Sequence, residues 1–209
     1  MTDTHPEFSW SDVHALGLPS ASGVMRSKSE DFRVEEVLGF EPDGEGEHIL
    51  LWIEKTDCNT AWVAGQIARL AGIQRRDLGY SGMKDRWAVT RQYFSLAGGA
   101  LSCDEWLALE TEGFKVLAAT AHRRKLRRGT HQANKFRLVI RQLEGDREAL
   151  EARLQSVAKG GVPNFFGDQR FGRDMGNLGL AQRVLSDPRR RWRMKSSSAP
   201  ASIGFASCR

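Results

Sequence analysis

Residues 31–72, DFRVEEVLGFEPDGEGEHILLWIEKTDCNTAWVAGQIARLAG, decide the fold because they combine strand, loop and helix patterns. Phe32 and Val34 alternate with charged residues, which is the pattern of a half-buried strand. Residues 48–55, HILLWIEK, predict a second strand, and the acidic, glycine-rich residues 39–47 between the two favour a loop. We therefore predict that the two strands form an antiparallel hairpin.

The end of the same stretch predicts a helix. Thr60 suits its N-cap and Gly72 suits its end. Its apolar residues recur at helical spacing: Trp62, Val63, Ile67 and Leu70. Further along the chain, the patterns predict strands over residues 92–96, 114–119 and 135–143, and an amphipathic helix over residues 146–157 with the stripe Leu150, Leu154 and Val157.

The strand predicted over residues 135–143 alternates clearly, with Phe136, Leu138 and Ile140 on one face. Strands follow one another directly as well as alternating with helices. This order favours an α+β fold, with a mainly antiparallel mixed sheet and packed helices, over a doubly wound parallel sheet.

Composition narrows the class of protein. Of the 209 residues, 40% are hydrophobic and 27% are charged, which is ordinary for a soluble globular chain. No apolar run is long enough to span a membrane, and the first residues do not have the pattern of a secretory signal. The three cysteines are isolated, so the sequence predicts neither a disulfide framework nor a zinc site, and a reducing cytoplasm is the expected location.

Charge is distributed unevenly along the chain. Residues 1–60 carry four Lys or Arg against thirteen Asp or Glu, a net charge of −9, so the remaining 149 residues carry +14. A split of this kind suggests that the later part binds a polyanion. A solvated basic face would give the same count, and charge alone leaves the two interpretations equal.

Residues 79–92, GYSGMKDRWAVTRQ, are the first candidate for chemistry. Two glycines three positions apart predict a tight turn, and Asp85 follows it between Lys84 and Arg86. A carboxylate flanked by two cations is held ionised and suits a nucleophile or a general base. An ordinary surface turn with solvated charges is the alternative for so short a motif.

Residues 121–137, AHRRKLRRGTHQANKFR, hold seven Lys or Arg and no acid, a density that suits a phosphate backbone. The candidate RNA-binding residues here are Arg123, Arg124, Lys125, Arg127 and Arg128. His122 and His131 have no second ligand near them in the sequence, so we expect them to face RNA or to be structural.

Residues 161–178, GVPNFFGDQRFGRDMGNL, form a glycine-rich segment in which aromatic residues stand beside Arg170 and Arg173. Aromatic faces next to arginines suit unstacked nucleotides, whereas phenylalanines that fill a core are the alternative. From residue 187 onward the chain shows neither helical nor strand periodicity and begins with a basic cluster, so we predict a disordered tail or an arm that binds an anionic partner.

In this order the segments resemble the motifs of the TruD family of tRNA pseudouridine synthases. The first motif is matched by Arg26, Asp31, Phe32, Val34 and Glu36. The GxKD turn and its AVTxQ continuation are matched by Gly82, Lys84, Asp85, Ala88, Val89, Thr90 and Gln92, and the NxF pair by Asn134 and Phe136. The PNxFGxQRFG motif is matched by Pro163, Asn164, Phe166, Gly167, Gln169, Arg170, Phe171 and Gly172.

The resemblance implies isomerisation of uridine 13, in the D arm of tRNA, to pseudouridine. It makes Asp85 the catalytic carboxylate, Phe136 the aromatic residue that stacks on the target base, and Asn134 its hydrogen-bonding neighbour. Arg26 stands where the family has a lysine, and we expect Phe32 and Lys84 to contact the substrate too. The resemblance implies no cofactor and no metal; the expected partner is tRNA, and the expected state is a monomer.

The resemblance covers residues 22–185 and implies a domain organisation. Residues 1–158 would form the N-terminal portion of the catalytic domain, 159–186 the start of an inserted TRUD domain, and 187–209 a basic, Ser/Ala-rich tail. Family members continue with a long helical region, so we expect a truncated, frame-shifted or deliberately shortened chain. Two hypotheses follow: an active synthase, or an RNA-binding fragment without turnover.

Overall fold

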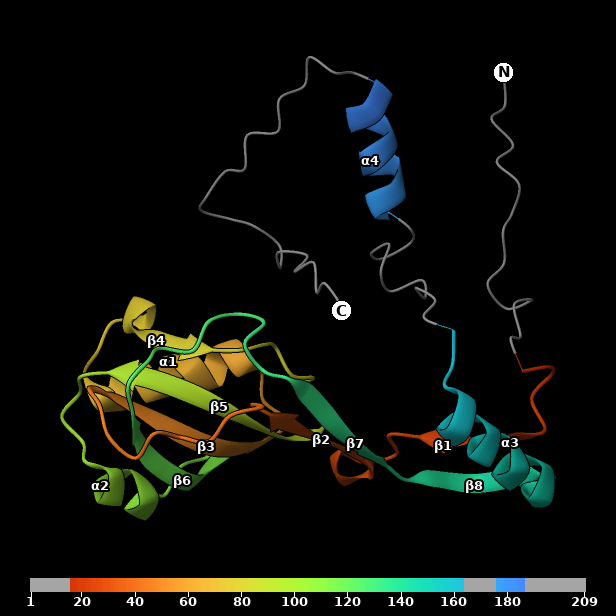
Figure 1. The fold of residues 1–209 in the computed structure, drawn as a ribbon, viewed down its shortest axis with the longest axis horizontal. Coiled ribbons are helices and arrows are strands. Elements are labelled where there is room, and N and C mark those ends of the chain that lie inside the picture. The colour runs from red at the N-terminus through yellow and green to blue at the C-terminus, as the bar shows by residue number, and fades with distance from the viewer. Residues whose placement is uncertain (1–15, 164–175, 187–209) are drawn as a thin grey trace. The chain divides into compact units, whose positions relative to one another are not determined.

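A computed structural model of the chain describes residues 16–163 and 176–186. The chain divides into two compact units, drawn as ribbons in Figure 1. The first, which we call the sheet unit, is Gly23–Leu143, and the second, the flanking unit, joins Met1–Ser22 to Glu144–Arg209. The domain division expected after residue 158 stays a prediction.

The sheet unit holds most of the strands. Its elements in chain order are η2 (Ser29–Asp31), β2 (Phe32–Val37), β3 (His48–Thr56), α1 (Thr60–Ala71), η3 (Arg75–Asp77), β4 (Leu78–Tyr80), β5 (Val89–Ala97), α2 (Cys103–Ala108), β6 (Phe114–His122) and β7 (Ala133–Leu138). Two further strands, β1 (Ala21–Met25) and β8 (Ile140–Gly145), run across the boundary between the units and form a two-stranded sheet.

The main sheet has the order β6-β3-β5-β2-β7, with β4 paired to β5. Only the β2–β5 pair of this described sheet is parallel, whereas the other strand pairs are antiparallel. The sequence prediction of an α+β fold with a mainly antiparallel mixed sheet is therefore confirmed.

The predicted hairpin between the first two strands is wrong, because β5 lies between β2 and β3 in the sheet. The loop that joins β2 to β3 bonds to the end of β6 instead. Gly44 donates its amide to the carbonyl of Ala121, and the amide of Arg123 donates to Asp43 at 2.9 Å. This second bond holds the pKa of Asp43 below its ordinary value. An alternating pattern identifies a strand but does not say which strand it pairs with.

Helix α1 covers one face of the sheet where β3, β5 and β6 lie (Figure 1). Val63 and Ile67 are buried there against residues of these strands such as Ile53 and Phe94. The helix ends at Gly72 in the left-handed conformation, as predicted, with φ 67°. Its N-cap is Asn59 rather than Thr60, because Thr60 is already helical whereas the backbone of Asn59 is extended.

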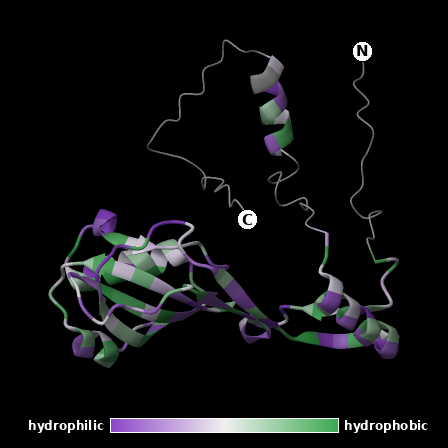
Figure 2. Ribbon diagram, in the orientation of Figure 1, coloured by the Kyte–Doolittle hydropathy of each residue, from purple (hydrophilic) through white to green (hydrophobic). Residues whose placement is uncertain are grey.

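The strand predicted over residues 135–143 is two strands, β7 and β8. The break falls at Val139, whose amide donates to the carbonyl of Asp31. Arg141 then turns back and donates two hydrogen bonds of 2.7 Å to the buried carboxylate of Asp31, which holds the pKa of Asp31 below its ordinary value. Ile140 therefore does not continue the face of Phe136. Hydrophilic colour in Figure 2 marks Asn134, Lys135 and Arg137 on β7, and the other three residues of this strand are hydrophobic.

The flanking unit contains α3 (Arg147–Gly160) and α4 (Gly176–Ser186). Asp146 caps α3 by accepting the amide of Ala149 at 3.0 Å, but no residue of this helix is buried, and Leu154 of its predicted apolar stripe is 58% exposed. The sequence patterns did not predict α4. The PNxFGxQRFG motif from residue 164 on, Arg170, Arg173 and the tail 187–209 lie outside the described residues.

Candidate active site

The turn that carries Asp85 follows β4, and its carboxylate is 51% exposed. Nη2 of Arg26 lies 3.6 Å from Oδ2 of Asp85. Arg26 has a φ of 58°, a left-handed conformation that is uncommon for a residue with a side chain. Its guanidinium lies 3.8 Å above the ring of Phe32. The site thus combines an exposed carboxylate with a permanent positive charge held against an aromatic face.

The two cations next to Asp85 in the sequence point elsewhere. Nζ of Lys84 lies 2.7 Å from Oε2 of Glu36, and both side chains are buried. Arg86 donates from Nε to the carbonyl of Asp57 at 3.3 Å. Of the described residues, Arg26 is the one whose cation pairs with Asp85. The prediction that Lys84 and Arg86 lie beside the carboxylate of Asp85 is therefore wrong.

Buried hydrogen bonds hold the turn from Gly82 to Lys84 in place. The Thr60 hydroxyl accepts the amide of Lys84 at 3.0 Å and donates to Oε1 of Gln92 at 2.8 Å. Gln92 in turn donates from Nε2 to the carbonyl of Gly82 at 3.1 Å. The first residue of α1 and the middle of β5 therefore fix the backbone that leads to Asp85.

A pocket of about 250 Å³ opens beside this turn. It is smaller than the roughly 300–1,000 Å³ of pockets that enclose a whole drug-sized ligand. Phe136 supplies an aromatic wall that is 61% exposed and meets Phe32 edge-on, with ring centroids 6.1 Å apart. The pocket is lined by Val34, Gly82, Met83, Lys84, Asp85, His131, Asn134 and Phe136.

Asn134 presents polar atoms to the same pocket. Its amide nitrogen lies 3.2 Å from Nε2 of His131, and because an amide nitrogen only donates, the imidazole accepts through Nε2. Within the described part of the chain, Oδ1 of Asn134 and Nδ1 of His131 are buried and have no hydrogen-bond partner. Such atoms are costly unless a ligand or water binds them, so this corner suits a hydrogen-bonding ligand.

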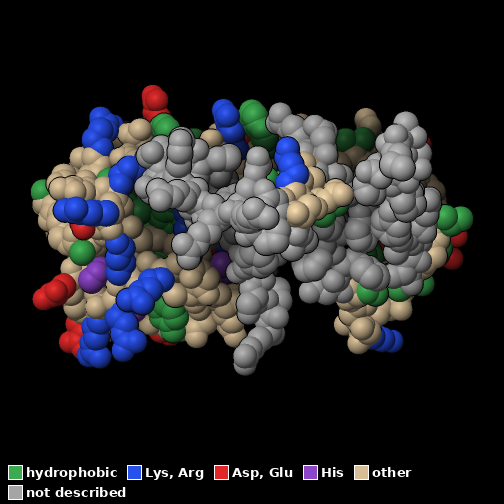
Figure 3. Space-filling model, turned by 90° about the horizontal axis from the view of Figure 1, so that it is seen from above, with side chains coloured by type: hydrophobic (Ala, Val, Ile, Leu, Met, Phe, Trp, Pro, Cys, Tyr) green, Lys and Arg blue, Asp and Glu red, His purple; other side chains and the backbone are tan. Residues whose placement is uncertain are grey.

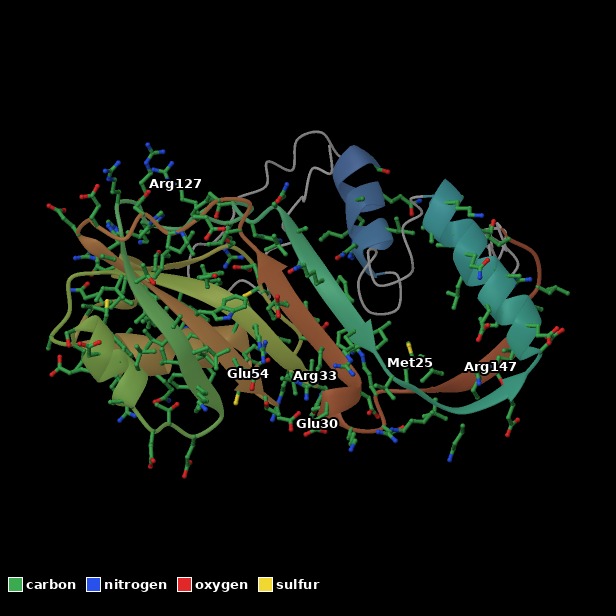
Figure 4. The ribbon with its side chains drawn as sticks, turned by 60° about the horizontal axis from the view of Figure 1, so that its bottom comes forward. Met25, Glu30, Arg33, Glu54, Arg127 and Arg147 are labelled. Carbon is green, nitrogen blue, oxygen red and sulfur yellow. The ribbon has the colours of Figure 1, made fainter. Side chains whose placement is uncertain are left out.

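The basic segment, which we define as residues 123–128, is exposed apart from Leu126. Leu126 packs with Leu38 and Leu50 and anchors the segment to the sheet. Lys and Arg side chains gather at the left of the view in Figure 3, and Arg127 stands at the opposite end of the sheet unit from Arg33 in Figure 4.

Two hydrogen bonds connect the end of the basic segment to the start of the Asp85 turn. The amide of Gly129 donates to the carbonyl of Ser81 at 2.7 Å, and the hydroxyls of Ser81 and Thr130 lie 2.8 Å apart. The segment richest in cations is therefore contiguous with the pocket.

The other face of β2, β5 and β7 carries a second cavity, of about 260 Å³. Arg91 bonds there to Glu54 at 2.8 Å and to Glu35 at 3.5 Å, so two of the carboxylates on this face are paired. Glu35 in this cavity is 42% exposed, so exposure alone does not separate it from Asp85. The GxKD motif, however, contains Asp85, whereas Glu35 stands at a position that no motif specifies. We therefore take the pocket beside Asp85 as the candidate active site.

The structure brings together Arg26, Phe32, Lys84, Asp85, Asn134 and Phe136, all singled out from the sequence. Sequence reasoning missed His131 as part of the pocket and the supporting roles of Glu36, Thr60 and Gln92. The family motifs contained Glu36 and Gln92, but a motif does not show which of its residues are buried supports. Among residues 16–163 and 176–186 there is no group of three or more potential metal ligands, and no helix is long and apolar enough to cross a membrane.

Comparisons with known proteins agree with the motifs. The model of the family described as tRNA pseudouridine synthase D (TruD) matches residues 11–185. A protein named tRNA pseudouridine synthase D from Methylococcus capsulatus is 51% identical over 177 residues, which cover 85% of this chain and 50% of that protein. Its namesake from Cellvibrio japonicus is 48% identical over 183 residues, which cover 86% and 54% of the two chains.

A solved structure has the same fold. The crystal structure of the putative tRNA pseudouridine synthase D from Methanosarcina mazei superposes with a TM-score of 0.63 at 28% identity, over 78% of this chain and 41% of that one. The chain spans about half the length of the curated relatives that it matches.

Proposed function

The chain belongs to the tRNA pseudouridine synthase D (TruD) family, and we propose on that premise that it isomerises uridine to pseudouridine in tRNA with Asp85 as the catalytic carboxylate. The substrate position that we propose is uridine 13 of the D arm. One observation carries the assignment of the catalytic group: an exposed carboxylate stands at a pocket that also presents an aromatic face and unpaired polar atoms.

The reaction breaks the bond from N1 of uracil to C1′ of the ribose and forms a bond from C5 to C1′. The hydrogen on C5 then leaves as a proton and N1 takes up a proton from water, so the product has the same composition as the substrate. A carboxylate can assist by attacking C1′ or by stabilising positive charge that develops on the ribose. Asp85 suits both routes, because its carboxylate is exposed at the pocket and carries no hydrogen bond to a buried group of the described chain.

The target base has to leave the stack of the RNA helix before a side chain can reach it. Phe136 supports this step, because an exposed aromatic ring offers a face on which an extruded base stacks. Asn134 supports recognition, because it lines the pocket and its buried, unpaired Oδ1 can accept the N3–H of uracil once the side chain turns toward the base. Arg26, close to the carboxylate, suits the phosphate or ribose next to that base.

Binding of the rest of the tRNA would rest on charge. The exposed Arg123, Arg124, Lys125, Arg127 and Arg128 suit phosphate groups. Gly129 and Thr130, which follow them, bond to Ser81 at the start of the Asp85 turn, so bound RNA would have a short path from these cations to the pocket. We also propose phosphate contacts for Arg170 and Arg173, which lie outside the described residues.

The direct test uses a tRNA transcript with tritium on uridine C5, because formation of the C5–C1′ bond releases that hydrogen to water. We expect the 209-residue chain to release tritium from this transcript and not from a matched transcript with cytidine at position 13. The Asp85→Asn variant keeps the size of the side chain and is expected to release none while binding tRNA with unchanged affinity.

Each outcome has a definite meaning. Tritium release that persists in Asp85→Asn would contradict the catalytic assignment, and release from the cytidine-13 transcript would contradict the proposed position. Salt-sensitive tRNA binding without any release by the unaltered chain would assign RNA binding, without turnover, to these 209 residues.

A further inference from the structure

Lys55 on β3 is a buried cation that the proposed reaction does not use. Its side chain is 0% exposed, and it does not line the pocket beside Asp85. A lysine in this position is rare, because burying an ammonium group costs free energy unless hydrogen bonds compensate. We therefore expect the buried ammonium group of Lys55 to donate hydrogen bonds that stabilise a particular part of the structure.

The partners of Lys55 are two backbone carbonyls. Nζ donates to the carbonyl oxygen of Asp85 at 2.7 Å and to that of Cys58, also at 2.7 Å. Cys58 lies in the connection that leads into α1, whereas Asp85 lies in the turn before β5. One side chain thus ties the backbone at Asp85 to the segment at the start of the helix.

We propose that Lys55 is a positioning residue of the active site: its ammonium group fixes the backbone at Asp85 so that the carboxylate faces the pocket. The inference rests on the catalytic role proposed for Asp85. It assigns Lys55 no contact with RNA, because a side chain buried on all sides cannot reach one.

The other anchors of the turn bind residues on either side of Asp85, including Arg86, which donates to the carbonyl of Asp57. Among the described residues, Lys55 is the one that bonds to the backbone of Asp85 itself. Gln92 holds the carbonyl of Gly82, Thr60 holds the amide of Lys84, and Glu36 holds the Lys84 side chain. Without Lys55, the carbonyls of Asp85 and Cys58 would be left without their buried donor, which is unfavourable enough for the turn to move. A displacement of about 1 Å at a catalytic group can lower a rate by roughly 10²-fold.

The charges around Lys55 agree with this role. Burial lowers the pKa of Lys55 to about 8, whereas negative charge on the Cys58 thiolate and on the carboxylates of Asp85 and Asp57 favours its charged form and Lys84 opposes it. On the neighbouring strands, Thr90 of β5 and Phe114 of β6 lie opposite Lys55 and carry no charge. Proton loss near pH 8 would weaken the two hydrogen bonds, since bonds from a charged donor are the stronger ones.

Hydrogen exchange on the 209-residue chain tests the proposal without relying on turnover. We expect Lys55→Met to raise amide exchange in residues 82–88 at least tenfold, with exchange in β3 and β6 unchanged. Lys115→Met is the matched control, because Lys115 lies on the adjacent strand β6 with an exposed side chain, and it should leave the turn unchanged. A folded Lys55→Met variant with a fully protected turn would overturn the proposal.

Two further readouts separate positioning from simple stability. Where the chain turns over, Lys55→Met should lower kcat by about 10²-fold with KM within about twofold, and Lys55→Arg should restore part of the rate, since an effect of this kind acts on geometry rather than on binding. Should Lys55→Met fail to fold, Lys55→Gln provides the test, because its shorter, neutral amide cannot hold both carbonyls as the ammonium group does. Exchange in residues 82–88 should again rise relative to β3 and β6, and a fully protected turn in folded Lys55→Gln would overturn the proposal.

The two proposals fail in different ways. If Asp85→Asn keeps its activity, the catalytic assignment is wrong, whereas the exchange measurements still report whether Lys55 holds the turn. If Asp85→Asn is inactive and substitution of Lys55 does not change hydrogen exchange in the turn, the catalytic role of Asp85 is supported and the positioning role of Lys55 is wrong.

Discussion

The Asp85 turn and the basic segment both lie next to Ser81, yet they are built in opposite ways. In the turn, the cations Lys55 and Lys84 are buried and bonded to fixed partners. In the basic segment, the cations are exposed, and Leu126 alone of residues 123–128 is buried. The same two residue types therefore provide geometry in one region and charge in the other.

The difference agrees with the roles that we propose for the two regions. A catalytic carboxylate needs a backbone that does not move, and buried hydrogen bonds provide it because their loss is costly. Electrostatic attraction between cations and a phosphate backbone depends little on direction. Exposed Lys and Arg side chains are therefore enough for binding, and a fixed geometry would add little to the affinity. Substitutions in the turn should therefore change stability and turnover, whereas substitutions in the basic segment should change affinity and its dependence on salt.

The largest effect on stability is expected from Glu36→Gln. The change preserves size but removes the anion that Lys84 pairs with at 2.7 Å, leaving a buried, uncompensated charge. We expect a loss of about 3–5 kcal/mol in the free energy of unfolding, measured with urea. Glu35→Gln is the control, because Glu35 is partly exposed and lies 3.5 Å from Arg91; its cost should stay below about 1 kcal/mol. Equal losses of unfolding free energy in Glu36→Gln and Glu35→Gln would contradict the stronger contribution of the buried ion pair.

A smaller effect is expected from pH, through Lys55. Burial lowers its pKa from 10.5 to about 8, so between these values the unfolded chain holds a proton that the folded chain has lost. Stability therefore rises with pH in this window, by up to about 3 kcal/mol at roughly 1.4 kcal/mol per pKa unit. The full cost of burying the charge is present below pH 8.

The measurement is the difference in unfolding free energy between the unaltered chain and Lys55→Met from pH 7.5 to 10.5. Burial raises the pKa of Cys58 and of Tyr93, and both groups lower stability at high pH, but they are present in both proteins and largely cancel in the difference. We expect the difference to shift in favour of the unaltered chain as pH rises. A constant difference would contradict the burial of a charged Lys55.

In the basic segment, Arg124→Ala combined with Arg127→Ala should leave the free energy of unfolding within about 0.5 kcal/mol, because both side chains are exposed. The plot of log Kobs for tRNA against log salt should become shallower by about 1.4–1.8, since each phosphate contact contributes roughly 0.7–0.9. A filter-binding titration at several salt concentrations measures this slope. An unchanged slope would mean that these arginines are a solvated face only.

The smallest effect on stability at the site is expected from Phe136→Ala, because the side chain is 61% exposed and meets Phe32 only at the edge of its ring. The free energy of unfolding should fall by less than about 1 kcal/mol. The rate constant kcat/KM for tritium release should nonetheless fall by about 5- to 150-fold, which corresponds to the roughly 1–3 kcal/mol of one base–aromatic stack. A large loss of stability with normal turnover would assign Phe136 to the core instead.

The sequence predicted the strands and the helix of residues 31–72 because alternation and helical spacing are local properties of the chain. Strand pairing is not local, so the insertion of β5 between β2 and β3 could not be read from either strand. The break at Val139 was missed for a similar reason, since it depends on bonds from residues 139 and 141 to Asp31, more than a hundred positions earlier.

The candidate site shows the same limit. Family motifs identified Asp85, Asn134 and Phe136, but adjacency in the KDR tripeptide suggested Lys84 as a cation beside the carboxylate, whereas Arg26 occupies that place. Lys55 could not be identified at all, because a lysine at the end of an apolar strand resembles an ordinary exposed strand end. Only the fold shows that it is buried under the Asp85 turn.

The most direct test of the contrast compares Asp85→Asn with the double variant of Arg124 and Arg127 by measuring single-turnover tritium release at saturating tRNA together with the Kd. We predict that Asp85→Asn abolishes release with an unchanged Kd, and that the double variant weakens binding but releases tritium at the normal rate once saturated. If Asp85→Asn weakened binding as strongly as the double variant, or if the double variant stayed inactive at saturation, the central claim would be contradicted. Catalysis would then not depend on the turn alone, and RNA binding would not depend on the basic segment alone.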